Sequence, residues 1–228
     1  MEFLSNYKDI DIFCFQEISY RATPGSIKHD QFDPVWNLFE EIEETLQDHK
    51  GYFRKHYRES FGLSAFVKRD IEIIGEAERF VHLPKEGTPL EEGKNARNLQ
   101  AVSLSVSGRE FHIFNFHGLW TGGGKDDTES RLEQSRRIAE FVNEFGDGKI
   151  LCGDFNLNPE TQSVKIIENI PMRNLVKEYD VSSTRTRYYP RDKKFADYIF
   201  VDDTIVVKDF KVLPDEVSDH SPLLLEFE

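Results

Sequence analysis

The chain has 228 residues, of which 38% are hydrophobic and 13% aromatic, enough apolar material for one large two-sheet domain with a substantial core. Its 42 acidic residues outnumber 29 lysines and arginines, and the resulting net charge of -13 argues against broad electrostatic capture of nucleic acid. No apolar run is long enough to span a bilayer, and the first residues lack the basic and apolar regions of a signal peptide. We therefore expect a single domain over residues 1–228 and a cytoplasmic location, which an upstream targeting segment would change.

Strand patterns dominate the first half of the chain. Residues 10–15 are apolar on both faces, and Asp33-Pro34 is expected to cap and open a helix with one apolar face. Ser107-Gly108 separates two strand-like runs and predicts a hairpin turn. Further strands are expected at residues 52–57, 63–67, 71–81, 99–106 and 110–116.

Helices and strands alternate in the second half. One helix is expected to start at about Thr128 and to stop at Gly146, and Asn158 and Pro159 are expected to cap and open another. The remaining strands are expected at residues 149–152, 198–201, 205–212 and 223–227. Amphipathic helices over strands buried on both faces predict an α+β fold, a four-layer αββα sandwich of two mainly antiparallel sheets flanked by helices.

An apolar run ends in the motif Gly-Asp-Phe-Asn at residues 153–156. Because side chains alternate along a strand, Asp154 and Asn156 are expected to point the same way where the strand runs out. Such a pair can hold a metal ion, a water molecule or a phosphate oxygen. The alternative is a tight turn in which the two side chains satisfy only their own backbone.

Polar clusters stand at the edges of four other predicted strands, namely Gln16-Glu17, Asn115 to His117, Asp197, and Ser218-Asp219-His220. Together with Gly-Asp-Phe-Asn, and in this order, they resemble the endonuclease/exonuclease/phosphatase superfamily over nearly the whole chain. The resemblance implies the fold of that family and hydrolysis of a phosphate ester. It also implies an opening strand that ends in a metal-site asparagine. Residues 1–7 do not match it, and we expect such a strand to be encoded upstream.

Four of these residues are carboxylates, namely Glu17, Asp154, Asp197 and Asp219. If the strand ends share one edge, these like charges converge and need a cation, for which carboxylates suit a hard divalent ion. Zinc would require cysteine or histidine at ligand spacing, which the chain lacks. We therefore expect Mg²⁺, with Mn²⁺ as the alternative. Glu17 is its expected main ligand with Asp219 nearby, as the resemblance also implies.

His220 and Asp197 are predicted to act as a pair. A carboxylate within reach can hold the imidazole in one tautomer and stabilise its charge, as general acid–base chemistry requires. The resemblance implies the same pair, and implies that Asp154 and Asn156 orient the attacking water and the phosphate. It further implies that His117 contacts the phosphate from the other side. The expected reaction is in-line hydrolysis of a phosphodiester without a covalent protein intermediate.

Substrate recognition is expected from residues 184–194, which hold five basic residues and two tyrosines. Arg185, Arg187 and Arg191 could clamp phosphates while an aromatic ring stacks on a base, and a solvated loop is the equal alternative. We expect nucleic acid as the substrate, with a phospholipid or an inositol phosphate as the alternative. A non-catalytic binding protein is the rival from another class, and the sequence does not predict the oligomeric state.

Overall fold

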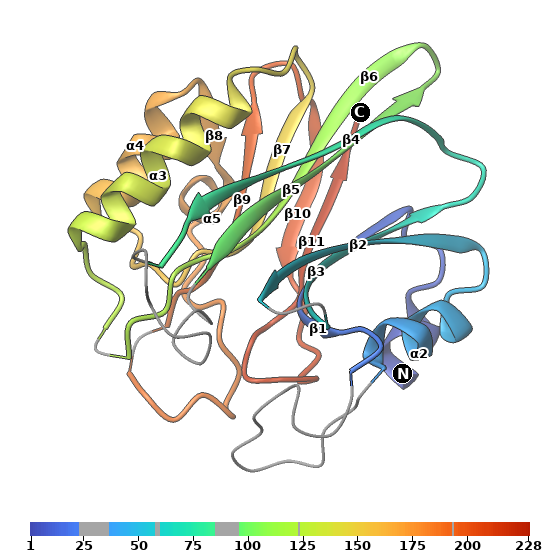
Figure 1. Cartoon of the computed structure of the whole chain (residues 1–228), viewed down its shortest axis with the longest axis horizontal. Coiled ribbons are helices and arrows are strands. Elements are labelled where there is room, and N and C mark those ends of the chain that lie inside the picture. Colours follow the sequence, from blue (N-terminus) through green and yellow to red (C-terminus); the bar gives the residue numbers. More distant parts are fainter. Residues whose placement is uncertain (23–36, 58–59, 85–95, 123, 193) are drawn as a thin grey trace.

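The computed structural model describes residues 1–22, 37–57, 60–84, 96–122, 124–192 and 194–228. These residues form five helices and eleven strands in three hydrogen-bonded sheets, so the predicted α+β class is confirmed (Figure 1). None of the helices in this described part combines the length and the apolar character needed to cross a membrane. Asp33-Pro34, predicted to start a helix, lies outside the described residues.

The largest sheet has six strands in the order β4-β5-β6-β7-β9-β8. Its strands are β4 (Glu72–His82), β5 (Arg97–Val106), β6 (Arg109–His117), β7 (Lys149–Asp154), β8 (Met172–Asn174) and β9 (Asp197–Asp202). The predicted hairpin turn at Ser107-Gly108 joins β5 and β6, and both residues have the positive φ that a type I′ turn requires. Strands β6 and β7 run parallel, whereas the other neighbours are antiparallel. The carboxyl ends of β6 and β7 therefore meet at one edge of the sheet.

A second sheet has the order β1-β3-β2 and consists of β1 (Ile12–Ser19), β2 (His49–Tyr57) and β3 (Phe61–Lys68). It packs against the six-stranded sheet through an apolar cluster that includes Val67 of β3 and Val102 of β5. The pairing of β1 with β3 shifts register between Phe15 and Ile18, which marks a β-bulge. Glu17 lies in this bulge with a φ of 60°, so the regular alternation of the strand is broken at that residue.

The third sheet is a hairpin of β10 (Val207–Val212) and β11 (Leu223–Phe227). The sequence predicted two sheets, whereas the described residues form three, because β11 pairs there with β10 alone and β1 pairs with β3 alone. Both β1 and β11 line a cavity of about 640 Å³. Its lining is apolar along the two strands and polar at the strand ends that carry the candidate site.

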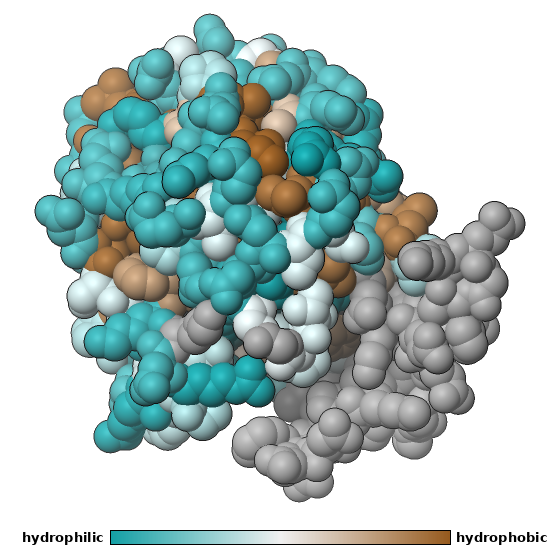
Figure 2. All heavy atoms as spheres, turned by 90° about the vertical axis from the view of Figure 1, so that its left-hand side faces the viewer, coloured by the Kyte–Doolittle hydropathy of each residue, from teal (hydrophilic) through white to brown (hydrophobic). Residues whose placement is uncertain are grey.

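Helices flank both larger sheets. Helices α3 (Glu129–Val142), α4 (Gln162–Asn169) and α5 (Leu175–Glu178) lie beside the six-stranded sheet, whereas α1 (Glu2–Asn6) and α2 (Leu38–Thr45) lie beside the three-stranded one (Figure 1). The side of the molecule that carries α3 and α4 is mostly hydrophilic, as expected of helices that bury one face (Figure 2). This arrangement agrees with the predicted αββα layering, which stays a prediction.

The two predicted helix starts that lie within the described residues had different outcomes. Helix α3 begins directly after Thr128, as predicted, and the hydroxyl of Thr128 caps it by accepting a backbone N–H of the first turn. Helix α4 begins after Thr161, whose hydroxyl caps it, and the prediction of Asn158 as the cap was wrong. The side chain of Asn158 donates instead to Oδ1 of Asp126 at 2.7 Å, which draws it away from the helix. Pro159 therefore lies in the loop before α4.

Candidate active site

The sheet brings three of the predicted residues into one row. His117 ends β6, Asp154 ends β7 and Asp197 begins β9. His117 is the register partner of Asp154, and Asp154 is the register partner of Asp197, so adjacent strands present them side by side. All three are buried. We call them the strand-end row. The sequence analysis made convergence of the carboxylates conditional on a shared edge, which Asp154 and Asp197 have, and the chemical roles of all three residues stay predictions.

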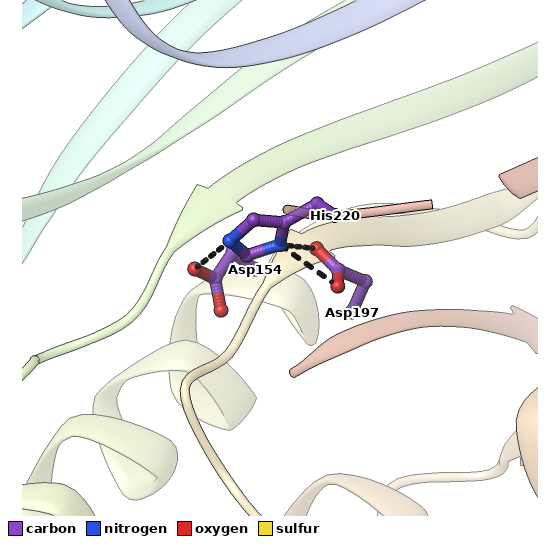
Figure 3. A group of neighbouring side chains, drawn as sticks. All are labelled: Asp154, Asp197 and His220. Carbon is purple, nitrogen blue, oxygen red and sulfur yellow. Dashed lines mark hydrogen bonds and ion pairs between the residues drawn. The ribbon is translucent and has the colours of Figure 1, made fainter. Parts of the chain in front are cut away.

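His220 reaches the strand-end row from the segment before β11. Its Nδ1 lies 2.8 and 2.9 Å from the two carboxylate oxygens of Asp197, and its Nε2 lies 3.7 Å from Oδ2 of Asp154 (Figure 3). Because Nδ1 donates to Asp197, the neutral imidazole keeps Nε2 as its basic nitrogen. Burial lowers the pKa of His220, but the hydrogen bond and the charge of Asp197 outweigh burial and raise the pKa above its ordinary value.

Asp154 makes the local backbone bond of the turn alternative with one oxygen, and its other oxygen faces the histidines. Its Oδ1 accepts the backbone N–H of Asn156 at 2.8 Å, which closes a local turn. Its Oδ2 lies 3.9 Å from Nε2 of His117 and 3.7 Å from Nε2 of His220. Burial, and next the charge of Asp197, raise the pKa of Asp154 to about 6. One carboxylate therefore closes a turn and faces two histidines.

Asn156 holds a strained backbone conformation next to the row. Its φ of 54° lies in the left-handed region, and its buried side chain donates to the carbonyl of Gly118 at 3.4 Å. Glu17 has a similar φ of 60°. Non-glycine residues in this region are strained, and such strain gathers at functional sites. Two predicted site residues therefore share a backbone feature that the sequence did not reveal.

The two predicted metal ligands lie next to the histidines. The side chain of Glu17 is 68% exposed, and its Oε1 is 3.7 Å from Nε2 of His117. Oδ1 of Asp219 lies 4.0 Å from Nε2 of His220, while its Oδ2 accepts a hydrogen bond from Arg185 at 2.8 Å. Glu17 and Asp219 also line the cavity between β1 and β11.

The polar pair Gln16 and Asn115 positions β1 against β6. Nε2 of Gln16 donates to Oδ1 of Asn115 at 2.8 Å, and the amide of Asn115 donates to the carbonyl of Phe15 at 3.0 Å. These bonds hold Glu17 of β1 next to His117 of β6. Their contribution to the site is positional.

A possible metal site is present among these residues. Asp154, Asp197 and His220 each offer one ligand atom, and the three atoms lie within 4.8 Å of one another. The carboxylates of Glu17 and Asp219 line the same cavity. Carboxylate oxygens and an imidazole nitrogen are ligands that a divalent metal ion can accept. The assignment of Glu17 and Asp219 as the ligands stays a prediction.

The three arginines predicted to bind substrate differ in position. Arg185 has 6% of its side chain exposed and donates to Asp219. Arg187 has 73% of its side chain exposed and pairs with Glu216 at 2.8 Å, and Arg191 is also exposed. Of the three, Arg185 alone is brought to the strand-end row.

Lys125 ends a glycine-rich loop, residues 120–125, that the sequence did not predict to bind phosphate, yet it lies buried close to Arg185. Its Nζ donates to the carbonyl of Phe195 at 2.6 Å, and its own carbonyl accepts the backbone N–H of Asn158 at 2.8 Å. Burial, and next the charge of Arg185, lower the pKa of Lys125 to about 8. Its burial was not predictable from the sequence, because its partners come from segments that are distant along the chain.

Solved structures share this fold at low sequence identity. A mannosyl-6-phosphatase of Bacteroides thetaiotaomicron is 20% identical with a TM-score of 0.75, over 100% of this chain and 88% of that one. The human Nocturnin catalytic domain with bound sulfate is 19% identical with a TM-score of 0.70, over 100% and 83%. D. rerio TDP2 complexed with a single-strand DNA product is 12% identical with a TM-score of 0.69, over 100% and 89%. At these identities the likeness shows the fold alone.

The sequence itself identifies the family. Residues 1–220 match the model of the Endonuclease/Exonuclease/phosphatase family, whereas no curated protein matches the chain. This match confirms the resemblance inferred from the motifs between Gln16 and His220. The chain belongs to the endonuclease/exonuclease/phosphatase family of hydrolases.

Proposed function

We propose that the chain is a Mg²⁺-dependent phosphodiesterase and that nucleic acid is its substrate. The hydrogen bond from Nδ1 of His220 to Asp197 carries the proposal, because it leaves Nε2 facing Asp154 at 3.7 Å. An imidazole that is fixed in one tautomer can exchange a proton with a phosphate or leaving-group oxygen. Hydrolysis by direct attack of water needs such a group and requires no nucleophilic serine or cysteine.

Each residue around the strand-end row has a part in this proposal. In its protonated form, which Asp197 favours, His220 donates a hydrogen bond or a proton from Nε2 to a phosphate oxygen, while its Nδ1 donates to Asp197. Asp154 and Asn156 orient the attacking water. His117 contacts the phosphate from the opposite side. Holding these groups in place beforehand lowers the entropic part of the barrier.

A divalent cation completes the proposed site, with Glu17 and Asp219 as its ligands. Bound there, Mg²⁺ or Mn²⁺ supplies positive charge that offsets the charge of the phosphate and of the leaving oxygen. The positions of Glu17 and Asp219, which line the same cavity as Asp154 and Asp197, support this assignment.

Nucleic acid is proposed as the substrate because Arg185 and Tyr189 lie together next to the reaction centre. The Arg185 guanidinium lies 4.2 Å from the centroid of the Tyr189 ring. A guanidinium and an aromatic ring in one place suit the phosphate and the base of a nucleotide. The structural neighbour TDP2, complexed with a single-strand DNA product, supports the same class.

A phosphorylated small molecule is the second candidate, because of the positions of Arg187 and Arg191. Both are exposed, and Arg187 is already paired with Glu216. With a net charge of -13, this leaves little basic surface to follow a long polyanion. The mannosyl-6-phosphatase among the structural neighbours supports this candidate.

The purified chain should be incubated with plasmid DNA, short RNA, sphingomyelin and inositol phosphates, each with Mg²⁺ and with a chelator. We expect cleavage of nucleic acid with Mg²⁺ only, and none by His220→Ala. If only sphingomyelin or inositol phosphates are turned over, that class replaces nucleic acid as the proposed substrate. Absence of turnover on every substrate would favour the non-catalytic alternative.

The exposed arginines separate a polymeric substrate from a short one. Replacing Arg187 and Arg191 together by alanine should weaken the affinity for a long oligonucleotide and flatten its salt dependence, because each lost phosphate contact releases fewer counterions. Binding isotherms at several salt concentrations measure both effects. An unchanged salt slope and affinity would point to a short or small substrate that contacts only Arg185.

A further inference from the structure

Lys125 and Arg185 lie over the same aromatic ring, that of Tyr189. Nζ of Lys125 lies 5.1 Å from the ring centroid, and the guanidinium carbon of Arg185 lies 4.2 Å from it. Both side chains are shielded from solvent, with Lys125 at 4% exposure and the Arg185 side chain at 6%. Two shielded cations on one ring repel each other, and Asp219 beside Arg185 offsets one of the two charges, so a further anion between or beside them is favourable. We call Lys125 and Arg185 the cation pair.

The cation pair has more hydrogen-bond donors than acceptors. Arg185 donates to Asp219, but its buried Nε has no hydrogen-bond partner among the described residues. The ammonium of Lys125 carries three donors, and the described structure gives it one acceptor, the carbonyl of Phe195. Because unsatisfied buried donors are unfavourable, this arrangement suits an acceptor that is brought by a ligand.

The cation pair adjoins the reaction centre. Arg185 forms a β-bridge with His220 and donates to Asp219, whose other oxygen is 4.0 Å from Nε2 of His220. Lys125 is tied through its carbonyl to Asn158, in the loop that follows Asp154. A ligand held by the cation pair would therefore lie next to the phosphate that His220 contacts.

We propose that Lys125, Arg185 and Tyr189 form a binding site for a second phosphate group of the substrate, next to the ester that is hydrolysed. This inference rests on the proposed function and narrows its substrate class to phosphate esters that carry a further, doubly charged phosphate. Such a phosphate offers several acceptor oxygens and two negative charges, which match the donors and the charge of the cation pair. A nucleic-acid strand with a phosphorylated end meets this description.

Binding of inorganic phosphate to the metal-free protein tests the cation pair by isothermal titration calorimetry, without any turnover. Lys125→Gln and Arg185→Gln remove the charge, yet each amide can still donate to Phe195 or Asp219. Each should weaken phosphate binding by about tenfold or more, the usual effect of losing a charged hydrogen bond. Unchanged phosphate affinity in both variants would overturn the proposal.

Matched controls come from two other pairs of a cation and an aromatic ring. Lys50 lies 4.9 Å from the ring centroid of Tyr52 and Arg109 lies 5.1 Å from that of Phe111, both exposed and outside the candidate site. Lys50→Gln and Arg109→Gln should leave phosphate affinity as in the parent. Lys125→Arg keeps the charge and should retain binding. If Lys125→Arg loses phosphate binding although circular dichroism shows that it is folded, the result would count against the proposal.

A dinucleotide with and without a terminal phosphate tests the role in catalysis. The parent should have the lower KM for the phosphorylated form, and Lys125→Gln should remove that preference by raising this KM most. If Lys125→Gln raises the KM for both dinucleotides equally, Lys125 acts at the reacting phosphate, and the proposal of a second-phosphate site is overturned. If the parent turns over neither dinucleotide, the proposed function fails, whereas calorimetry still decides whether the cation pair binds phosphate.

Discussion

Two buried aspartates of the six-stranded sheet have opposite environments. Burial and Asp197 raise the pKa of Asp154 to about 6. Burial also acts to raise the pKa of Asp202, but hydrogen bonds from Thr204 and from the backbone of Lys149 outweigh it and lower the pKa. The charged form is therefore disfavoured at Asp154 and favoured at Asp202. A buried carboxylate whose charged form is disfavoured is typical of a functional site. One whose charged form is stabilised by hydrogen bonds is typical of a structural role.

Asp154→Asn should raise the melting temperature of the metal-free protein at pH 8. A raised pKa in the folded state means that Asp154 favours folding below its ordinary pKa of 3.8 and loses this contribution as the pH rises through about 6. The free energy of unfolding of the variant should therefore exceed that of the parent by up to about 3 kcal/mol above pH 6, and should equal it near pH 4. Thermal melts at both pH values measure the difference.

Asp202→Asn serves as the control for that measurement. Since hydrogen bonds favour the charged form of Asp202, its replacement should lower the melting temperature at pH 8. If Asp154→Asn is instead destabilised like the control, the Asp154 carboxylate is a structural group and its raised pKa has no functional meaning.

His220→Ala should lower kcat by roughly 10²- to 10⁴-fold while the fold stays intact, because it removes the proposed acid–base group. Asp197→Asn should lose much of the same activity, since an amide can leave the imidazole in the wrong tautomer. In the double variant the two losses should not multiply, because the residues act as a unit. Steady-state kinetics on the three variants measure these losses. If the two losses multiply in the double variant, His220 and Asp197 do not act as a unit.

At the scale of elements, the close approach of β6 and β7 sets the geometry of the site. Gly153 comes directly before Asp154 and has a φ of 135°. A Cβ added there would collide with the carbonyl oxygen of Phe116 on β6. The two strands can therefore bring His117 and Asp154 together only because residue 153 has no side chain.

Gly153→Ala should destabilise the protein by about 2–4 kcal/mol and reduce turnover, because both the positive φ and the backbone contact oppose a Cβ. Urea unfolding measures the loss. Gly75→Ala on β4 is the matched control, since a Cβ there would meet only the Cβ of Ser103 at 3.8 Å. Equal unfolding midpoints for the two variants would show that β6 and β7 do not depend on this contact.

Elements with a strong local signal were predictable, and placements that depend on distant contacts were not. The alternating runs predicted most strands, and the apolar face formed by residues between Leu132 and Phe145 predicted α3 and its start near Thr128. Strand β8 and helix α5 were missed because they span only three and four residues. The start of α4 was missed because Asp126 draws Asn158 away from the helix.

The candidate site shows the same division. Strand alternation and motif order predicted the residues of the strand-end row, because the site lies where strands end. The burial of Lys125 could not be predicted, since Phe195 and Tyr189 approach it only in the folded chain. Likewise, Glu216 draws Arg187 outward through an ion pair between segments that the sequence does not show to be neighbours.

At the scale of the whole molecule, a net charge of -13 and a cluster of acids at one sheet edge favour binding of a divalent cation. A ligand that binds only the folded state raises stability in proportion to the logarithm of its concentration above Kd. Mg²⁺ should therefore raise the melting temperature progressively at constant ionic strength, as a differential scanning experiment would record. A chelator should reverse the rise. An unchanged melting temperature at saturating Mg²⁺ would argue against a metal site in this protein.

The most direct test of the central claim is the turnover rate of a phosphodiester substrate measured against Mg²⁺ concentration. The parent should lose activity in chelator and regain it with Mg²⁺. Glu17→Gln should need about tenfold or more Mg²⁺ for half of its maximal rate, because the site loses a full negative charge. Glu110→Gln, near the opposite end of β6 from His117, should keep the parental Mg²⁺ dependence. Turnover that survives chelation, or a Glu17→Gln curve that overlays the parental one, would contradict a Mg²⁺-dependent phosphodiesterase with Glu17 at its metal.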